Sequence, residues 1–350
     1  MGIVRRLLGR EPQTCPGCGK PFSKRYPNGK ELSCSYCGRR LRIEKNGRSI
    51  TIIGDPCGAD QQHEAGSVAS DCVAATGVAS SHVSVATVVV SSMNTQRMLK
   101  KIRMKELCKA VQSTLALNAG DIVIVFPGGW FDAGTGKAES LYEWMERGIC
   151  PLLATRKESV VVCCGVDAYR EQMGVAIGKS GIVALARKFK AAPKEQHIDW
   201  ILAKDYLADE KGKSRIFDVG GKRFYLSVCY DDFGIIKDDL PIPNGGIDAI
   251  LSLVHFFTSR TSKEGGSGEA YYAKYGFSRA SKAWSCRLFG AAVFLRPKIP
   301  PNWPSGVRWA GEELPTKKSK YEDFRLIPNQ ELKEVRLGPG VVANIRMYRM

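Results

Sequence analysis

The chain has 350 residues, of which 44% are hydrophobic and 25% charged, and its formal net charge is +17. This composition is typical of a globular protein, and the length allows a large domain plus a small one. No stretch is long and apolar enough to cross a bilayer, and the first ten residues lack the apolar core of a secretory signal. We therefore expect a cytoplasmic protein without a membrane partner. In a reducing compartment, its twelve cysteines would serve as metal ligands, catalysts or core residues rather than as disulfides.

Residues 1–53 are predicted to form a small basic zinc ribbon. They contain two C-x-x-C pairs separated by fifteen residues, and a glycine follows each pair. This spacing is typical of a structural zinc ion held by four thiolates. So short a module has little core of its own, so zinc would supply much of its folding free energy. The expected ligands are Cys15, Cys18, Cys34 and Cys37. Strands are expected near residues 41–43 and 50–53.

The positive charge is concentrated at the N-terminus, where residues 1–50 hold twelve Lys or Arg and three Glu, a net +9. A basic segment of this kind indicates a nucleic-acid or protein partner, although it also occurs in modules that are merely soluble. Residues 54–82 contain four acids, no Lys or Arg, and many Gly, Ala and Ser, which is typical of a flexible linker. The larger domain is therefore predicted to span residues 83–350.

The larger domain alternates buried strands with helices and then changes to hairpins. Helices are predicted at 94–117, at 138–145 with Pro151 beyond the end, and at 267–288. Strands are predicted at 83–90, 121–126, 159–166, 248–254, 289–295, 324–327, 333–337 and 341–347, with a hairpin at 174–189. The proline-rich segment 298–315 is predicted to be a surface excursion. This order predicts a layered α/β domain with a mixed sheet.

The stretch from 215 to 233 predicts a strand, a turn at Gly220-Gly221, and a second strand that stops at Cys229. The polar residues after Cys229 do not fit a continued buried strand. The carboxyl end of a buried strand is a favoured place for a nucleophile, because ligands of open α/β sheets bind there. Alternatively, Cys229 is one more small buried residue, as most free cysteines are.

Several segments, in this order, resemble the nitrilase-like carbon–nitrogen hydrolase family over roughly residues 83–348. They are DIVIVFPGG, ALARKFKAAP and FYLSVCYDDF, followed by ILSLVHFF and KAWSCRLFGAAVF. The resemblance implies a four-layer αββα sandwich that forms a homodimer or a larger assembly. It also implies a small-molecule amide or nitrile substrate, a cysteine thioester intermediate, and catalysis without a cofactor.

The resemblance also assigns roles. Cys229 would attack the substrate carbon, while Lys188 and the backbone N–H of Tyr230 would stabilise the oxyanion. Lys190 and Lys194 lie close in sequence and are alternatives to Lys188.

The chain departs from the family pattern most seriously at Gly128, which stands where the family has its general-base glutamate. It also has Ser285 and Cys286 where the family usually has Glu-Asn, and Gly234-Ile235 where a Pro-Glu often follows the nucleophile. Two explanations remain open: another carboxylate serves as the base, or the site has lost hydrolysis and the fold is a binding scaffold. The substitute carboxylates considered are Asp132, Glu139 and Asp231. Asp231 alternatively only caps the turn after Cys229. His255 ends a strand near the expected pocket and is interpreted as a structural histidine.

Overall fold

The structure is a computed structural model that describes residues 31–33, 40–43, 50–54, 82–92, 100–258, 271–295, 298–299, 303–308, 325–327 and 329–350. The chain forms two compact units, Met1–Ala74 and Ala75–Met350. The first contains an antiparallel sheet in the order β1-β2-β3, with bounds Glu31–Ser33, Arg40–Ile43 and Ile50–Gly54. The two strands predicted for this module are therefore confirmed. The four predicted zinc ligands, Cys15, Cys18, Cys34 and Cys37, lie outside the described residues.

The second unit is built on one mixed sheet, whose main path runs β10-β11-β12-β13-β4-β5-β7-β8-β9. Pairing is parallel from β11 to β7 along this path and antiparallel in the hairpins at both ends. The strands of this path are β4 (Ser84–Ser92), β5 (Ile122–Val125), β7 (Val160–Ala168), β8 (Glu171–Gly178), β9 (Gly181–Arg187), β10 (Ile216–Val219), β11 (Lys222–Val228), β12 (Ala249–Thr258) and β13 (Arg287–Leu295). The strands off the path are β6 (Phe131–Asp132), β14 (Gly306–Arg308), β15 (Arg325–Leu326), β16 (Glu331–Gly338) and β17 (Val341–Arg349).

The two halves of this sheet face each other across a shared core. Side chains of β5, β7, β8 and β9 pack there against side chains of β10, β11, β12 and β13. Small residues allow the close approach: a Cβ on Gly174 would lie 3.1 Å from the side chains of Leu226 and Leu253. This core puts the carboxyl ends of β7, β11 and β12 near one another, which is where the candidate site lies.

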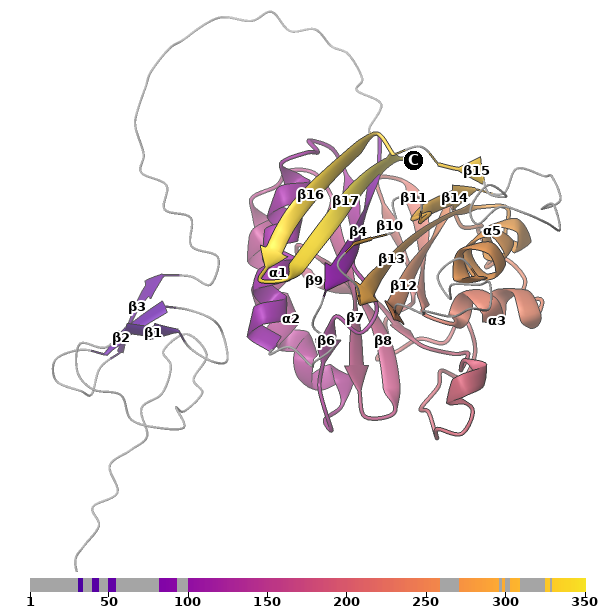
Figure 1. Cartoon of the computed structure of the whole chain (residues 1–350), viewed down its shortest axis with the longest axis horizontal. Coiled ribbons are helices and arrows are strands. Elements are labelled where there is room, and N and C mark those ends of the chain that lie inside the picture. The colour runs from indigo at the N-terminus through magenta and orange to yellow at the C-terminus, as the bar shows by residue number, and fades with distance from the viewer. Residues whose placement is uncertain are drawn as a thin grey trace, which may run out of the picture. The chain divides into compact units, whose positions relative to one another are not determined.

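Helices cover the outside of both halves, as Figure 1 shows. One group contacts β8, β9 and β16, and consists of α1 (Lys100–Leu115), η1 (Ala138–Leu141) and α2 (Tyr142–Ala154). The other contacts β11, β13 and β14, and consists of α3 (Asp231–Lys237), the π-helical η3 (Ala273–Phe277) and α5 (Ser278–Ala283). A short turn, η2 (Pro193–Glu195), follows β9. Within the described ranges, no helix is long and apolar enough to cross a bilayer.

The mixed α/β class and most predicted strands are confirmed. The ends of two predicted helices were wrong, and so was the surface position predicted for one segment. The helix expected at 138–145 continues to Ala154 with Pro151 inside it, because Ile149 and Leu153 keep the same face buried. The helix expected to reach residue 288 ends at Ala283, and Ser285 turns the chain with a φ of 50°. The segment expected to be a surface excursion includes the buried Trp303 and strand β14, which pairs with β13 and β15.

The packing of the two half-sheets predicts a strong response to truncation at Leu226. Leu226 is fully buried in the shared core, whereas Leu332 on β16 is 57% exposed. We expect Leu226→Ala to lower the free energy of unfolding by about 2–5 kcal/mol, because it removes buried apolar contacts and leaves a cavity. Leu332→Ala is the matched control and should change it by about 0.5 kcal/mol or less. Urea unfolding followed by circular dichroism measures both, and equal effects would contradict the described packing.

Candidate active site

Cys229 stands in a strand-to-helix turn with an unusual backbone. β11 ends at Val228, α3 begins at Asp231, and Cys229 has a φ of 50°. A non-glycine residue in this left-handed region costs about 1–2 kcal/mol, so its neighbours must hold it there. Its N–H donates to the Leu253 carbonyl at 3.0 Å and continues the parallel pairing with β12. The side chain is half-buried and packs at the edge of the shared core.

Asp231 ties the Cys229 turn to the end of β9. Its fully buried carboxylate forms an ion pair with the equally buried Arg215 at 3.3 Å. It also accepts backbone N–H groups from Val228 at 3.2 Å, Phe189 at 2.8 Å and Lys190 at 3.0 Å. These partners occupy both oxygens, which favours the turn-capping interpretation of Asp231 over that of a base.

Lys188 follows β9 on the face that looks into the shared core. Strand alternation puts it on the same side as Ala184 and Ala186, which belong to that core. Its ammonium is 1% exposed and donates to Gln172 Oε1 at 2.7 Å and Glu195 Oε2 at 2.6 Å. The Trp200 ring lies 5.3 Å from the same nitrogen. The alternative Lys190 instead pairs with Asp238 at the surface, at 2.6 Å.

His255 enters the site from an irregular part of β12. The pairing of β12 with β13 shifts register between Leu253 and Phe256, and such irregularities re-aim side chains near sites. His255 Nε2 lies 2.6 Å from Asp167 Oδ1, an oxygen of β7. Nδ1, the other ring nitrogen, is buried and has no hydrogen-bond partner among the residues that the structure describes.

The charge of the His255 ring is set by two neighbours. Burial alone would lower the pKa of His255, but the Asp167 carboxylate and the Cys229 sulfur as thiolate outweigh it and raise that pKa to about 10. The cysteine, the histidine and the aspartate therefore lie close enough to act on one another, although they come from β11, β12 and β7.

Two glycines leave the space that the His255 ring occupies. A Cβ on Gly128 would lie 2.7 Å from His255 Nδ1 and 2.6 Å from the Leu253 carbonyl oxygen. A Cβ on Gly129, whose φ is 58°, would lie 2.8 Å from His255 Cδ2 and 2.7 Å from Asp167 Oδ2. Real Cβ atoms do not approach this closely, so any side chain at either position would displace the imidazole or the carboxylate.

A second hydrogen-bond network holds Cys229 from the outer side of β11. The Asp232 carboxylate accepts from Ser227 at 2.6 Å, from Ser252 at 2.5 Å and from the Tyr272 hydroxyl at 3.3 Å. That hydroxyl also donates to the Cys229 carbonyl. Burial raises the pKa of Asp232 to about 7, although the hydrogen bonds from the two serines oppose this rise.

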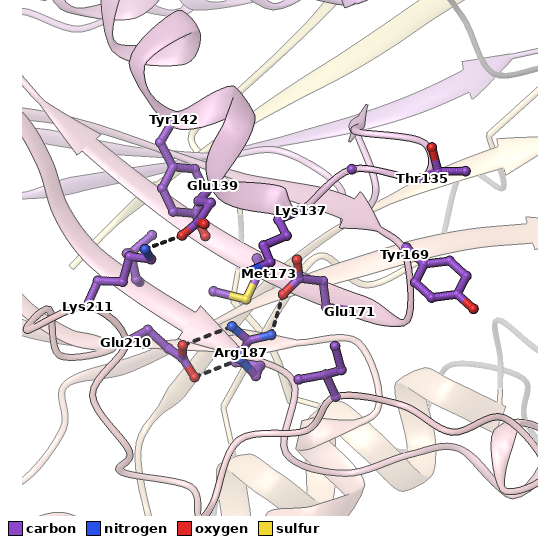
Figure 2. A pocket seen from close by; sticks show the side chains of 13 residues that line it. Thr135, Lys137, Glu139, Tyr142, Tyr169, Glu171, Met173, Arg187, Glu210 and Lys211 are labelled. Atoms are coloured by element: carbon purple, nitrogen blue, oxygen red, sulfur yellow. Dashed lines mark hydrogen bonds and ion pairs between the residues drawn. The ribbon is translucent and has the colours of Figure 1, made fainter.

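A pocket of about 500 Å³ lies on the opposite face of β8 and β9, against η1 and α2, and contains charges of both signs. Figure 2 shows Arg187 between Glu171 and Glu210, and Lys211 against Glu139. Alternation along β9 puts Arg187 and Lys188 on opposite faces of the strand. Glu139, one of the substitute bases considered, therefore faces away from Cys229 and is already paired.

The structure thus brings together Cys229 and two residues that the sequence did not assign, His255 and Asp167. Asp132, another substitute base considered, is the β6 register partner of Asp167, and its carboxylate accepts the Gly134 N–H at 2.6 Å. Tyr230 caps α3, and its ring stacks on Phe233 at 4.4 Å. The sequence placed His255 at the end of a strand near the expected pocket, but gave no signal that distinguishes a catalytic histidine from a structural one.

No family model matches the chain, and no curated protein matches it. Among solved structures it is similar to a mutant amidase of the nitrilase superfamily from Nesterenkonia AN1, with 12% identity and a TM-score of 0.48 over 77% of this chain and 91% of that one. It is also similar to a carbon–nitrogen hydrolase from Helicobacter pylori G27, with 10% identity and a TM-score of 0.44 over 61% of this chain and 73% of that one. A third neighbour is a glutamine-dependent NAD(+) synthetase from Cytophaga hutchinsonii, with 10% identity and a TM-score of 0.40 over 61% of this chain and 36% of that one. At these identities and TM-scores, we base no functional conclusion on the likeness.

The burial of Asp231 predicts a large stability effect. Asp231→Asn keeps the shape but removes the negative charge, leaving Arg215 buried without its counter-ion, so we expect a loss of about 3–5 kcal/mol in unfolding free energy. Asp238→Asn breaks the surface pair with Lys190 and should cost about 0–1 kcal/mol. Urea unfolding compares the two variants. A small effect of Asp231→Asn would show that the carboxylate does not organise this turn.

Proposed function

We propose that the chain is a carbon–nitrogen hydrolase that cleaves a non-peptide amide or nitrile through a thioester on Cys229. The observation that carries the proposal is the half-buried Cys229, held with a positive φ at the carboxyl end of β11. Turns between a strand and a helix with strained backbone recur at nucleophiles, because they expose the reacting atom above the sheet. The resemblance of FYLSVCYDDF to the nucleophile segment of the nitrilase-like family supports the same reaction class.

The proposed reaction has two steps. In the first, the Cys229 sulfur as thiolate attacks the carbonyl carbon of an amide and the carbon–nitrogen bond breaks, so that an amine or ammonia leaves and a thioester remains. A nitrile would first give a thioimidate, which one water converts to the same thioester with release of ammonia. In the second, water attacks the thioester, the carbon–sulfur bond breaks, and a carboxylic acid is released. Lys188 and the Tyr230 N–H are the proposed donors to the oxyanion in both steps. Asp231 is proposed to position the turn rather than to touch the substrate.

The fold detail that accompanies this function is also a proposal. Two half-sheets around a shared core, with helices outside each, support the four-layer αββα sandwich that the sequence resemblance implies. The same resemblance leads us to propose a homodimer or a larger assembly.

The proposal predicts that hydrolysis depends on one sulfur. Cys229→Ala should abolish ammonia release from a panel of small amides and nitriles, while Cys150→Ala, also a partly exposed cysteine, should retain it. A slow substrate should leave an acyl mass increment on wild-type protein, and the increment should map to the peptide that contains Cys229.

A chain without turnover whose Cys229 reacts with iodoacetamide no faster than an unfolded thiol would contradict the hydrolase. That result would favour the other candidate function, a binding scaffold that has lost catalysis.

For the N-terminal module we propose a structural zinc ion and, because of its basic charge, a nucleic-acid or protein partner. The sequence spacing of the four cysteines and the antiparallel β1-β2-β3 sheet support the proposal. We expect about one zinc per full-length chain by elemental analysis, and loss of that zinc in Cys34→Ser. Cys57→Ser, outside the two pairs, is the control and should keep the metal. Zinc retained in Cys34→Ser would contradict the four-thiolate site.

A further inference from the structure

We infer that His255, oriented by Asp167, is the proton acceptor and donor of Cys229, in the place of a carboxylate at position 128. This inference rests on the proposed function and names the base that the reaction requires. It makes the site a cysteine–histidine–aspartate triad assembled from β11, β12 and β7. The role of His255 is catalytic, because its ring exchanges a proton with the reacting sulfur, whereas Asp167 is a positioning residue.

The first support is the geometry of the ring. Asp167 holds Nε2 at 2.6 Å, which leaves Nδ1 as the nitrogen for the thiol. Nδ1 is buried without a hydrogen-bond partner in the described part of the chain, and an unpartnered buried nitrogen costs free energy unless another group uses it. Cys229 interacts with the same ring. An aspartate that fixes one imidazole nitrogen while the other faces a nucleophile is the arrangement that general-base catalysis uses.

The second support is steric. A Cβ atom on Gly128 or Gly129 would overlap the ring or the Asp167 carboxylate, so the imidazole and a side chain at 128 exclude each other. A side chain is also excluded at Gly165 on β7, because its Cβ would lie 2.4 Å from Gly128 Cα. Glycine at 128 is therefore what the histidine needs, and its presence does not indicate that catalysis has been lost.

The third support is electrostatic. The Asp167 carboxylate and the Cys229 sulfur both favour the imidazolium, and a cation beside a thiol in turn favours its thiolate form. Among the described residues, these two groups have the largest charge effect on the ring. Around Cys229 lie also the buried Asp231, Asp232 and the hydroxyl of Tyr272. Of these, Asp232 titrates near neutrality and needs its own control.

The proton balance closes without another co-reactant. The thiolate forms the carbon–sulfur bond, and the imidazolium gives its proton to the leaving nitrogen as the carbon–nitrogen bond breaks. The neutral imidazole then takes a proton from the attacking water and keeps it, so that the thioester opens with the sulfur leaving as thiolate beside the imidazolium. The products are an amine or ammonia and a carboxylic acid, and the enzyme regains its starting state.

The experiment measures the rate of Cys229 alkylation by iodoacetamide against pH, in the full-length protein, with the labelled peptide identified by mass spectrometry. We expect wild-type protein to react at about pH 6 within a few-fold of its rate at about pH 9, because the thiolate persists beside an imidazolium. His255→Gln should react about 100-fold more slowly at pH 6 than at pH 9, as an ordinary thiol does. Asp167→Asn should shift the profile in the same direction.

Two further variants separate this role from a structural one. Gly128→Ala should reproduce the His255→Gln profile, because the added methyl group displaces the ring, while Gly136→Ala adds a methyl group with milder contacts and should leave the profile unchanged. Asp232→Asn weakens the hydrogen bonds that support the Cys229 turn and should lower the rate at every pH, but the ratio of the rates at about pH 6 and about pH 9 should stay as in wild type. If any variant fails to fold by circular dichroism, the remaining ones still decide the question.

The outcomes distinguish the inference from the function on which it rests. Fast alkylation at pH 6 in both His255→Gln and Asp167→Asn, with hydrolysis retained, overturns the triad and leaves the Cys229 hydrolase standing. A profile that moves only in Asp232→Asn assigns the titration elsewhere and also overturns it. Wild-type Cys229 that is inert at every pH removes both proposals. Loss of the neutral-pH reactivity together with a fall in kcat/KM of about 10²–10⁴-fold in His255→Gln supports the triad.

Discussion

The space beside residue 128, just after β5, restricts which side chains can form the site. It holds either a side chain on residue 128 or the imidazole of His255, because a Cβ at 128 would lie 2.7 Å from Nδ1. The backbone restricts a side chain at 128 further, since the same Cβ would also lie 2.6 Å from the carbonyl oxygen of Leu253. The absence of a carboxylate side chain at position 128 and the presence of the His255 ring beside it are thus linked by packing. The inferred triad accounts for the departure from the family pattern at Gly128 as the replacement of one base by another.

The cations of the inner face each have their own carboxylate. Lys188 is paired with Glu195 at 2.6 Å, and His255 with Asp167 at 2.6 Å. Buried charges without partners are expensive, so each carboxylate offsets the cost of burying the cation that it pairs with. The pairing also fixes their geometry, because Gln172, which accepts from Lys188, is the cross-strand partner of Asp167. The proposed oxyanion donor and the proposed proton relay are therefore neighbours through a single glutamine.

The sequence was sufficient for the parts of this site that depend on local pattern. The Gly220-Gly221 turn and the alternation before Cys229 predicted the strand and its end, whereas Lys188 was assigned only through the resemblance of ALARKFKAAP to a segment of the nitrilase-like family. His255 carries no such local signal, since a histidine at the end of an apolar strand looks the same whether it is structural or catalytic. Its role depends on Asp167, which lies 88 residues away in sequence, and on empty space beside Gly128. Neither the contact between β12 and the residues that follow β5 nor the space beside Gly128 is visible in a linear pattern.

The strained backbone of Cys229 is held from both sides by adjacent acids. Asp231 acts through the Val228 N–H and Arg215, and Asp232 acts through Tyr272, whose hydroxyl donates to the Cys229 carbonyl. A left-handed φ costs about 1–2 kcal/mol, whereas a hydrogen bond to a charged group contributes about 1.5–3 kcal/mol. The Val228 bond to Asp231 alone is thus sufficient to offset the strain, and the contact from Tyr272 adds to it. Asp231 and Asp232 therefore support the Cys229 turn at the carboxyl end of β11. The residues inferred to hold and transfer protons, His255 and Asp167, come from β12 and β7.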